Sequence, residues 1–163
     1  PLVVREFLLN RGIKMVVVPH FKKTCLDGGV LIDRNGTPII ALSLRHDRID
    51  NFWFTLSHEI AHLVLGHVHS TEGQCIIDDL DLRDSLNDNE SEADKVAQQA
   101  LISNDIWFSH HVRLTHKVDD VIDLAAKADI HPAIVAGRIR FENNNYRILH
   151  NQVGYRQIRE LFL

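Results

Sequence analysis

Residues 54–67, "FTLSHEIAHLVLGH", place two histidines and a glutamate inside a run that is otherwise almost entirely apolar. The apolar positions in and around this run cover nearly the whole helical wheel, which is typical of a helix buried on most sides. Burial of His58, Glu59 and His62 costs on the order of several kcal/mol unless these side chains are paired or bound to something. The sequence therefore predicts a buried helix over roughly 51–66 that carries a polar site.

The spacing of the three polar residues indicates what that site binds. His58 and His62 are four residues apart, so they project from one helical face and both imidazoles can reach a single ion. Glu59 lies on the neighbouring edge of the same helix. This H-E-x-x-H pattern is the zinc peptidase signature, in which the histidines bind the metal and the glutamate acts as base on its water. The chain has eleven histidines, so the pattern can arise by chance, but its buried helical setting strengthens the assignment.

A catalytic zinc site normally has three protein ligands, so a third ligand is expected. Residue 68 is valine, which excludes the metzincin pattern with its third histidine six residues on. In "NESEADKVAQQALI", residues 89–102, Glu90 and Asp94 lie on one face of a predicted helix. We expect Glu90 to bind the metal directly and Asp94 to accept the second N–H of a ligand histidine. Glu92 is the alternative ligand, but it points to another face.

These motifs resemble the ImmA/IrrE family of small zinc metallopeptidase domains. The resemblance is carried by "FWFTLSHEIAHLVLGH" and "NESEADKVAQQALIS", and by "CIIDDLD" and "IHPAIVAGRIR". It covers most of the chain and is looser in the N-terminal strands. It implies a minimal gluzincin fold with His58, His62 and Glu90 as Zn²⁺ ligands and Glu59 as the catalytic base.

The resemblance also implies a biological setting. Domains of this family often follow an N-terminal helix-turn-helix domain, and members cleave a repressor protein and so relieve transcriptional repression. We therefore expect residues 1–163 to form a single endopeptidase domain that acts on a repressor-type protein in a stress, toxin–antitoxin or mobile-element circuit. An upstream DNA-binding domain is expected in the full-length chain. The alternatives are a sensory or interaction domain of a transcription regulator that binds zinc without turnover, and a purely structural zinc site.

Gluzincins also use a second group to stabilise the oxyanion, and the sequence does not single one out. The candidates for contact with the substrate or the oxyanion are His67, His131, Tyr146 and His150. On a continuous helix His67 would lie about 140° round from His62, beyond the helix end predicted at Gly66.

The order of predicted elements indicates an α+β fold. We expect a short N-terminal helix closed by Gly12 and then a three-stranded antiparallel meander within residues 13–44 that packs on the His58 helix. Asn35 and Gly36 form the strongest short hairpin signal in the chain, between strands at Val30–Asp33 and Pro38–Leu44. The C-terminal half is predicted to be helical at roughly 90–101, 118–128 and 131–142.

Charge and composition exclude some other functions. The chain is 45% hydrophobic and 25% charged with a net charge of −4, which argues against nucleic-acid binding by the whole domain. "LAAKADIHPAIVAGRIR", residues 124–140, superficially resembles a DNA-binding helix-turn-helix, but the aspartates around it would face phosphates. A helical hairpin beneath the metal site is the preferred interpretation.

Two further segments are strongly charged. Residues 71–94 contain nine acidic residues and one arginine, which is typical of a solvated loop. The C-terminal tail is basic, and we expect it to contact either an acidic partner or this acidic segment. Its arginines are Arg138, Arg140, Arg147, Arg156 and Arg159.

Cellular location is inferred from two absences. The chain has only two cysteines, too few for a disulfide framework, which favours a reducing, cytoplasmic setting. No apolar run reaches the roughly 18 residues that a membrane span requires.

Overall fold

The computed structural model describes residues 1–20, 26–68, 75–78 and 88–162. The fold is α+β, as the sequence predicts. The element order is α1 Leu2–Leu9, β1 Lys14–Val17, β2 Gly28–Ile32, β3 Pro38–Leu42, α2 Ile49–Val64, β4 Cys75–Asp78, α3 Asp88–Leu101, α4 Asn104–Ser109, α5 Val112–Thr115, α6 Val118–Lys127, α7 Pro132–Glu142, the 3₁₀ helix η1 His150–Gln152 and α8 Arg159–Phe162.

The predicted hairpin is confirmed at β2 and β3. The two strands pair antiparallel, with Val30 opposite Ile40, and Gly36 adopts a φ of +79° in the turn between them. Oδ1 of Asp33 accepts hydrogen bonds from the backbone N–H groups of Asn35, at 2.9 Å, and Thr37, at 2.8 Å. The side chain of Asp33 therefore closes the turn that glycine makes possible.

The prediction of a three-stranded antiparallel meander is wrong, because the sheet is mixed and has the order β1-β3-β2-β4. β1 pairs parallel with β3, with Lys14 opposite Ile39. Residues 18–27 join β1 to β2. A tight hairpin would place these two consecutive strands side by side, but a connection of this length does not require one. β3 therefore occupies a central position, where Ile40 and Leu42 are 0% and 1% exposed.

β4 is a further correction, since it lies in the acidic stretch predicted to be a solvated loop. It pairs antiparallel with β2. The remaining parts of that stretch before residue 88 lie outside the described residues, so a contact between it and the basic tail stays a prediction. Within the described tail, Arg159 donates from Nη2 to the carbonyl of Leu44 at 2.8 Å.

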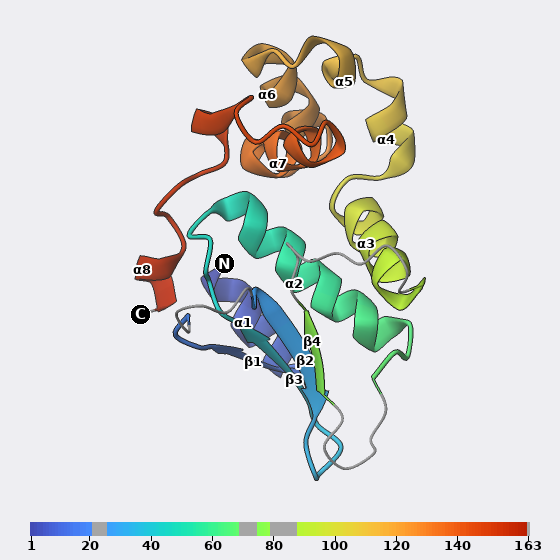
Figure 1. Cartoon of the computed structure of the whole chain (residues 1–163), viewed down its shortest axis with the longest axis vertical. Helices are drawn as coiled ribbons and strands as arrows, with labels where there is room; N and C mark the ends of the chain where they lie inside the picture. The colour runs from blue at the N-terminus through green and yellow to red at the C-terminus, as the bar shows by residue number, and fades with distance from the viewer. Residues whose placement is uncertain (21–25, 69–74, 79–87, 163) are drawn as a thin grey trace.

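Helix α2 lies between the sheet and the helical half of the molecule (Figure 1). On its sheet side, Phe52 and Leu56 pack in one hydrophobic cluster with Val30, Ile40 and Leu42. α3 lies alongside α2, and α7 packs on it from the other half. The predicted buried helix is confirmed, and it organises the whole fold.

A second hydrophobic cluster fills the helical half. Its buried members include Trp107, Val121, Leu124 and Ile139, and Trp53 of α2 packs against both clusters. The predicted helical hairpin is α6 and α7, which pack on each other while α7 contacts α2. α4 and α5 were not predicted, because they are short and their packing is decided by Trp107 and Val112 in this cluster.

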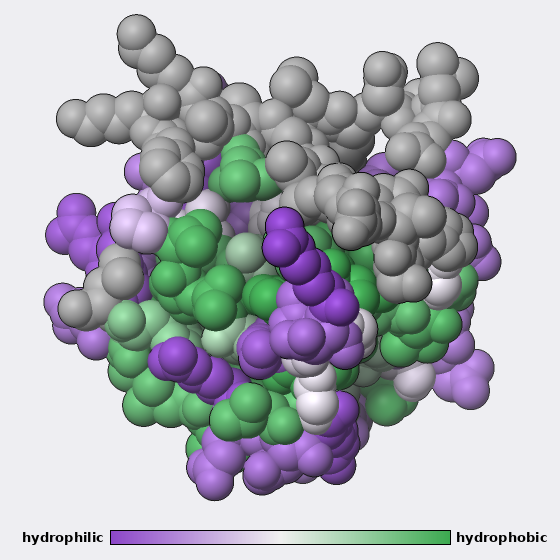
Figure 2. Space-filling view, turned by 90° about the horizontal axis from the view of Figure 1, so that it is seen from below, coloured by the Kyte–Doolittle hydropathy of each residue, from purple (hydrophilic) through white to green (hydrophobic). Residues whose placement is uncertain are grey.

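The sheet end of the molecule carries exposed apolar side chains. Figure 2 views the molecule from below and shows hydrophobic residues gathered in the middle of this face with hydrophilic residues around and between them. On α1, the exposed large apolar residues are Leu2, Val3, Phe7 and Leu9. Among the described residues, no helix is long and apolar enough to cross a membrane.

Candidate metal centre

Helices α2 and α3 lie side by side and bring three donor groups to one point. Nε2 of His58 lies 2.9 Å from Nε2 of His62 and 3.1 Å from Oε2 of Glu90. Nε2 of His62 lies 3.4 Å from Oε1 of Glu90. In the part of the chain that the structure describes, these three residues form the only group of histidine, cysteine and carboxylate side chains suited to hold a metal ion. We call this group the metal centre.

The donor set fits a small divalent ion. Tetrahedral coordination with ligand distances of about 2.0–2.2 Å places the donor atoms roughly 3.3 Å from one another, close to the separations of 2.9–3.4 Å found here. His58 and His62 are 1% and 0% exposed, whereas the side chain of Glu90 is 28% exposed. The centre is therefore built on a buried helix face and is closed from the solvent side by α3.

Each ligand histidine is also held through its other ring nitrogen. Nδ1 of His58 lies 2.9 Å from Oδ1 of Asp94, one turn after Glu90 on α3. Nδ1 of His62 lies 3.0 Å from Nδ1 of His67, whose Nε2 lies 3.5 Å from Oε2 of Glu92. Contacts of this kind fix the tautomer and the orientation of a ligand imidazole. Glu92, the alternative ligand, therefore faces His67 and not the metal centre.

His67 reaches His62 because the helix ends where the sequence predicts. Gly66 adopts a φ of +72°, the backbone N–H of His67 bonds to the carbonyl of His62 at 2.9 Å, and that of Gly66 bonds to the carbonyl of Leu63 at 3.2 Å. This is the Schellman arrangement, which turns the chain back on the last helical turn. The angle of about 140° between His62 and His67 holds only for a continuous helix and does not apply beyond this turn. A contact of His67 with a ligand histidine was therefore not predicted.

The electrostatics of the metal centre favour an ionised carboxylate. Hydrogen bonds from His58 and then His62 hold the pKa of Glu90 well below its usual range, and they outweigh the opposing effect of burial. A metal ligand must be deprotonated to bind. Glu90 is therefore in the required state throughout the neutral pH range.

Glu59, the predicted base, is completely buried and faces strand β2. A methyl group at residue 28 would lie 2.5 Å from Oε1 of Glu59 and 2.7 Å from Cγ2 of Thr55. Only a glycine leaves room for the Glu59 carboxylate against this strand. The close approach of Gly28 to Glu59 is not predicted from the sequence, in which the pair of glycines at residues 28–29 is the only signal.

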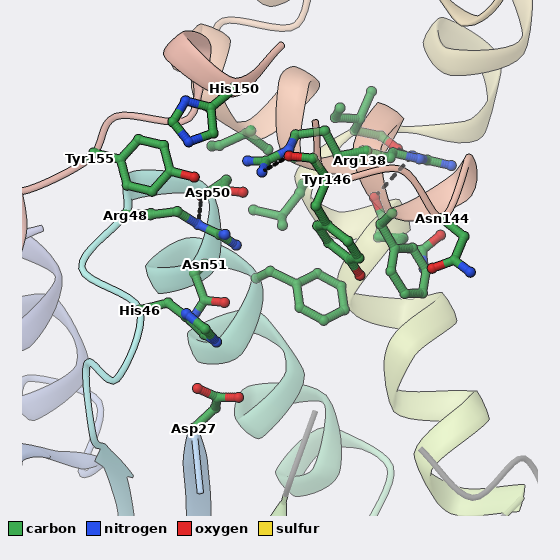
Figure 3. Close-up of a pocket in the computed structure, with 18 residues that line it drawn as sticks. Asp27, His46, Arg48, Asp50, Asn51, Arg138, Asn144, Tyr146, His150 and Tyr155 are labelled. Carbon is green, nitrogen blue, oxygen red and sulfur yellow. Dashed lines mark hydrogen bonds and ion pairs between the residues drawn. The ribbon is translucent and has the colours of Figure 1, made fainter. Parts of the chain in front are cut away.

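A pocket of about 750 Å³ lies between α2, α3, α7 and the C-terminal segment. Its wall includes Phe54, whose ring centroid is 6.1 Å from that of His58. It also includes Asp27, which directly precedes Gly28. Figure 3 shows Asp27 at the strand end of the pocket and Tyr146 reaching into it from the C-terminal segment. The pocket wall therefore includes a ring neighbour of His58 and the residue before Gly28, whereas the metal ligands and Glu59 are not part of it.

The remaining candidate residues fall at different places. Tyr146 and His150 line the pocket, and the ring of His150 packs at 4.7 Å from that of Tyr155. His131 is the N-cap of α7, where its Nδ1 accepts a hydrogen bond from the N–H of Ala133 at 3.1 Å. The structure brings His67 to the metal centre through His62, brings Tyr146 and His150 to the pocket, and gives His131 a helix-capping contact. A role of any of the four toward an oxyanion stays a prediction.

Comparison of the chain with known protein families finds no matching family model, and no curated protein matches it either. The kind of site is therefore judged from the geometry of the metal centre and from the buried Glu59.

Proposed function

We propose that this chain is a zinc-dependent endopeptidase domain of the gluzincin type, and that its substrate is a repressor-type regulatory protein. The observation that carries the proposal is the convergence of His58, His62 and Glu90 with a buried Glu59 next to them on α2. Two imidazoles and one carboxylate are a donor set that catalytic zinc sites use, and three protein ligands leave one position open. A structural site is usually closed by a fourth protein ligand and needs no base.

The roles of the chain's residues follow from their surroundings. When bound, Zn²⁺ supplies a water of lowered pKa and polarises a carbonyl group. Glu59 takes a proton from the attacking water and delivers it to the leaving amine. Asp94 and His67 hold the two ligand imidazoles in position through Nδ1. Gly28 leaves room for the Glu59 carboxylate.

Strand β4 supports a way to bind an extended substrate. In the described sheet β4 is an edge strand, with β2 as its neighbour on one side. Asp78 of β4 lies opposite Gly28, which itself abuts Glu59. A peptide added to this edge by backbone hydrogen bonds would run past the metal centre. We propose this edge as the substrate-binding strand.

The test compares wild type with Glu59→Gln, both loaded with zinc. Each protein is incubated with the transcription regulator encoded beside its gene and with a peptide library, and new chain termini are identified by mass spectrometry. New termini from the wild type alone support the peptidase. A zinc-loaded wild type that leaves both substrates intact would instead favour a zinc-binding sensory or interaction domain in a transcription regulator. For either function we propose that the protein acts in the cytoplasm.

A further inference from the structure

One arginine on the pocket wall forms no ion pair with an acidic side chain in the described part of the chain. Most charged side chains on the pocket wall have a partner within ion-pair distance: Asp27 lies 3.6 Å from Arg45, Arg48 lies 3.0 Å from Asp50 and Arg138 lies 3.0 Å from Glu142. Arg140 also lines the pocket and is in no such ion pair among the described residues. The charge of Arg140 acts to lower the pKa of Asp50, but that carboxylate is already paired with Arg48 at 3.0 Å, so Arg140 has no acid of its own.

The guanidinium of Arg140 is buried with most of its donors unused. The residue is 2% exposed, and Nη2 donates to the carbonyl of Tyr146 at 2.5 Å. Nε and Nη1 are buried and have no acceptor among the described residues. An arginine carries five N–H donors and stays protonated, and burial of an ionised group without partners is costly. Arg140 is therefore placed to bind an anion that the chain itself does not supply.

The position of this arginine relative to the metal centre follows from α2. Asp50 packs against Gly137 of α7, where a methyl group would lie 2.6 Å from Cβ of Asp50. Along α2, the positions of Asp50, Phe54 and His58 are each four residues apart. Eight residues of helix rise about 12 Å, a distance that an extended peptide covers with about three or four residues. The α7 side of the pocket is thus within reach of a segment bound at the metal centre.

The walls around Arg140 are apolar and aromatic. They include Phe54 and Phe141, whose ring centroids are 6.2 Å apart, and Tyr146, whose ring centroid is 5.6 Å from Cζ of Arg140. A planar carboxylate matches the guanidinium, which binds such groups through two parallel N–H donors. The aromatic walls suit an apolar group on the same ligand.

We propose that this pocket is a carboxylate-binding site in which Arg140 binds the acid group and the aromatic walls hold the apolar part of the same ligand. The identity of the ligand rests on the proposed peptidase function. If that function holds, the ligand is a substrate segment with an acidic residue about three or four positions from the cleaved bond. The other source of the same chemistry is a small aromatic organic acid.

The test measures binding to zinc-loaded Glu59→Gln, so that no turnover is required. The peptide probe is Ac-Ala-Ala-Phe-Glu-Ala-Ala-NH2, and its control has Gln in place of Glu. The small probe is 3-phenylpropionate, and its control is 3-phenylpropionamide. At least one acid probe should bind about tenfold more tightly than its neutral control. Tighter binding of the peptide identifies a substrate segment, and binding of the small acid alone identifies an organic acid.

Two readouts assign the effect to Arg140. In ¹⁵N–¹H spectra of the otherwise unchanged protein, one arginine Nε–H signal should shift with the acid probe and not with the amide. Arg140→Lys keeps the charge but loses the two-donor edge, so binding of the acid should weaken about tenfold. Arg138→Lys is the matched control, because its guanidinium already bonds to Glu142 and to the carbonyl of Ile102. Equal affinity for acid and amide, or no shift of an arginine signal, would overturn the proposal whether or not the protein is a peptidase.

Discussion

Nδ1 of His58 lies 2.9 Å from Oδ1 of Asp94, while Nε2 of the same ring lies 3.1 Å from Oε2 of Glu90. One turn of α3 therefore holds both ends of one imidazole. Glu90 contributes a donor to the metal centre, and Asp94 fixes the ring that presents another. Neighbouring acids on one helix thus have different tasks, and this difference can be measured.

Asp94→Asn should lower zinc affinity about 10- to 100-fold, because the charge that orients His58 is lost while the shape of the side chain is kept. Affinity is measured by competition with a chromogenic chelator. Glu92→Gln is the control, since Glu92 has a 59% exposed side chain and contacts His67 at 3.5 Å. An exposed pair of this kind is worth about 0–1 kcal/mol, so the control should lose less than about fivefold. Equal losses in both variants would refute a special role for Asp94.

Gly28→Ala should impair catalysis while the three metal ligands stay in place. The added methyl group would lie 2.5 Å from Oε1 of Glu59, so the carboxylate or the strand must shift, at a cost of about 1–3 kcal/mol. Urea unfolding measures this cost, and zinc content is measured in parallel. In a Glu59→Ala background the same substitution should cost less. An unchanged cost there would show that Gly28 does not act through Glu59.

Gly66→Ala should destabilise the protein by about 1–2 kcal/mol, because alanine is strained at a φ of +72°. It should also weaken zinc binding, since the turn that brings His67 to His62 depends on this conformation. Gly12→Ala is the matched control, with a φ of +78° and no atom within 4 Å of an added Cβ, as at Gly66. It should lose similar stability in urea unfolding and retain its zinc affinity. Unchanged zinc affinity in Gly66→Ala would contradict a supporting role for His67.

The pH dependence of stability should reveal the burial of Asp50. Burial raises the pKa of this carboxyl above its ordinary value of 3.8, and the neighbouring Arg48 opposes the rise. A raised folded-state pKa contributes stability that is fully present below the unfolded pKa and is lost as the pH rises through the folded pKa. Wild type should therefore lose stability relative to Asp50→Asn as the pH rises from just below 3.8. Urea unfolding of both proteins across the acid range measures this difference, and a difference that grows in favour of wild type would have the wrong sign.

The sequence predicted those parts of the centre that depend on local spacing. His58 and His62 on one helix, and Glu90 and Asp94 on another, are pairs of residues four apart, and a helix places such pairs on one face whatever surrounds it. The same holds for the Asn35–Gly36 turn. Each prediction needed only the conformation of one element.

The features that the sequence did not predict depend on contacts between distant elements. The parallel pairing of β1 with β3 depends on which strand occupies the centre of the sheet. The approach of Gly28 to Glu59 and the unpaired donors of Arg140 depend on how β2 and α7 pack on α2. The contact of His67 with His62 was not predicted for a different reason, because the chain reverses at Gly66 and helical spacing no longer applies.

The central claim is tested most directly by measuring bound zinc per chain in wild type, Glu90→Ala and Glu59→Gln after gentle purification. The account predicts about one zinc in wild type and in Glu59→Gln, and a sharp loss in Glu90→Ala, which leaves His58 and His62 as a weak pair. Thermal unfolding of each variant checks that the fold is retained. The contradictory result is a Glu59→Gln protein that loses zinc while Glu90→Ala keeps it, because the ligand and the base would then be exchanged.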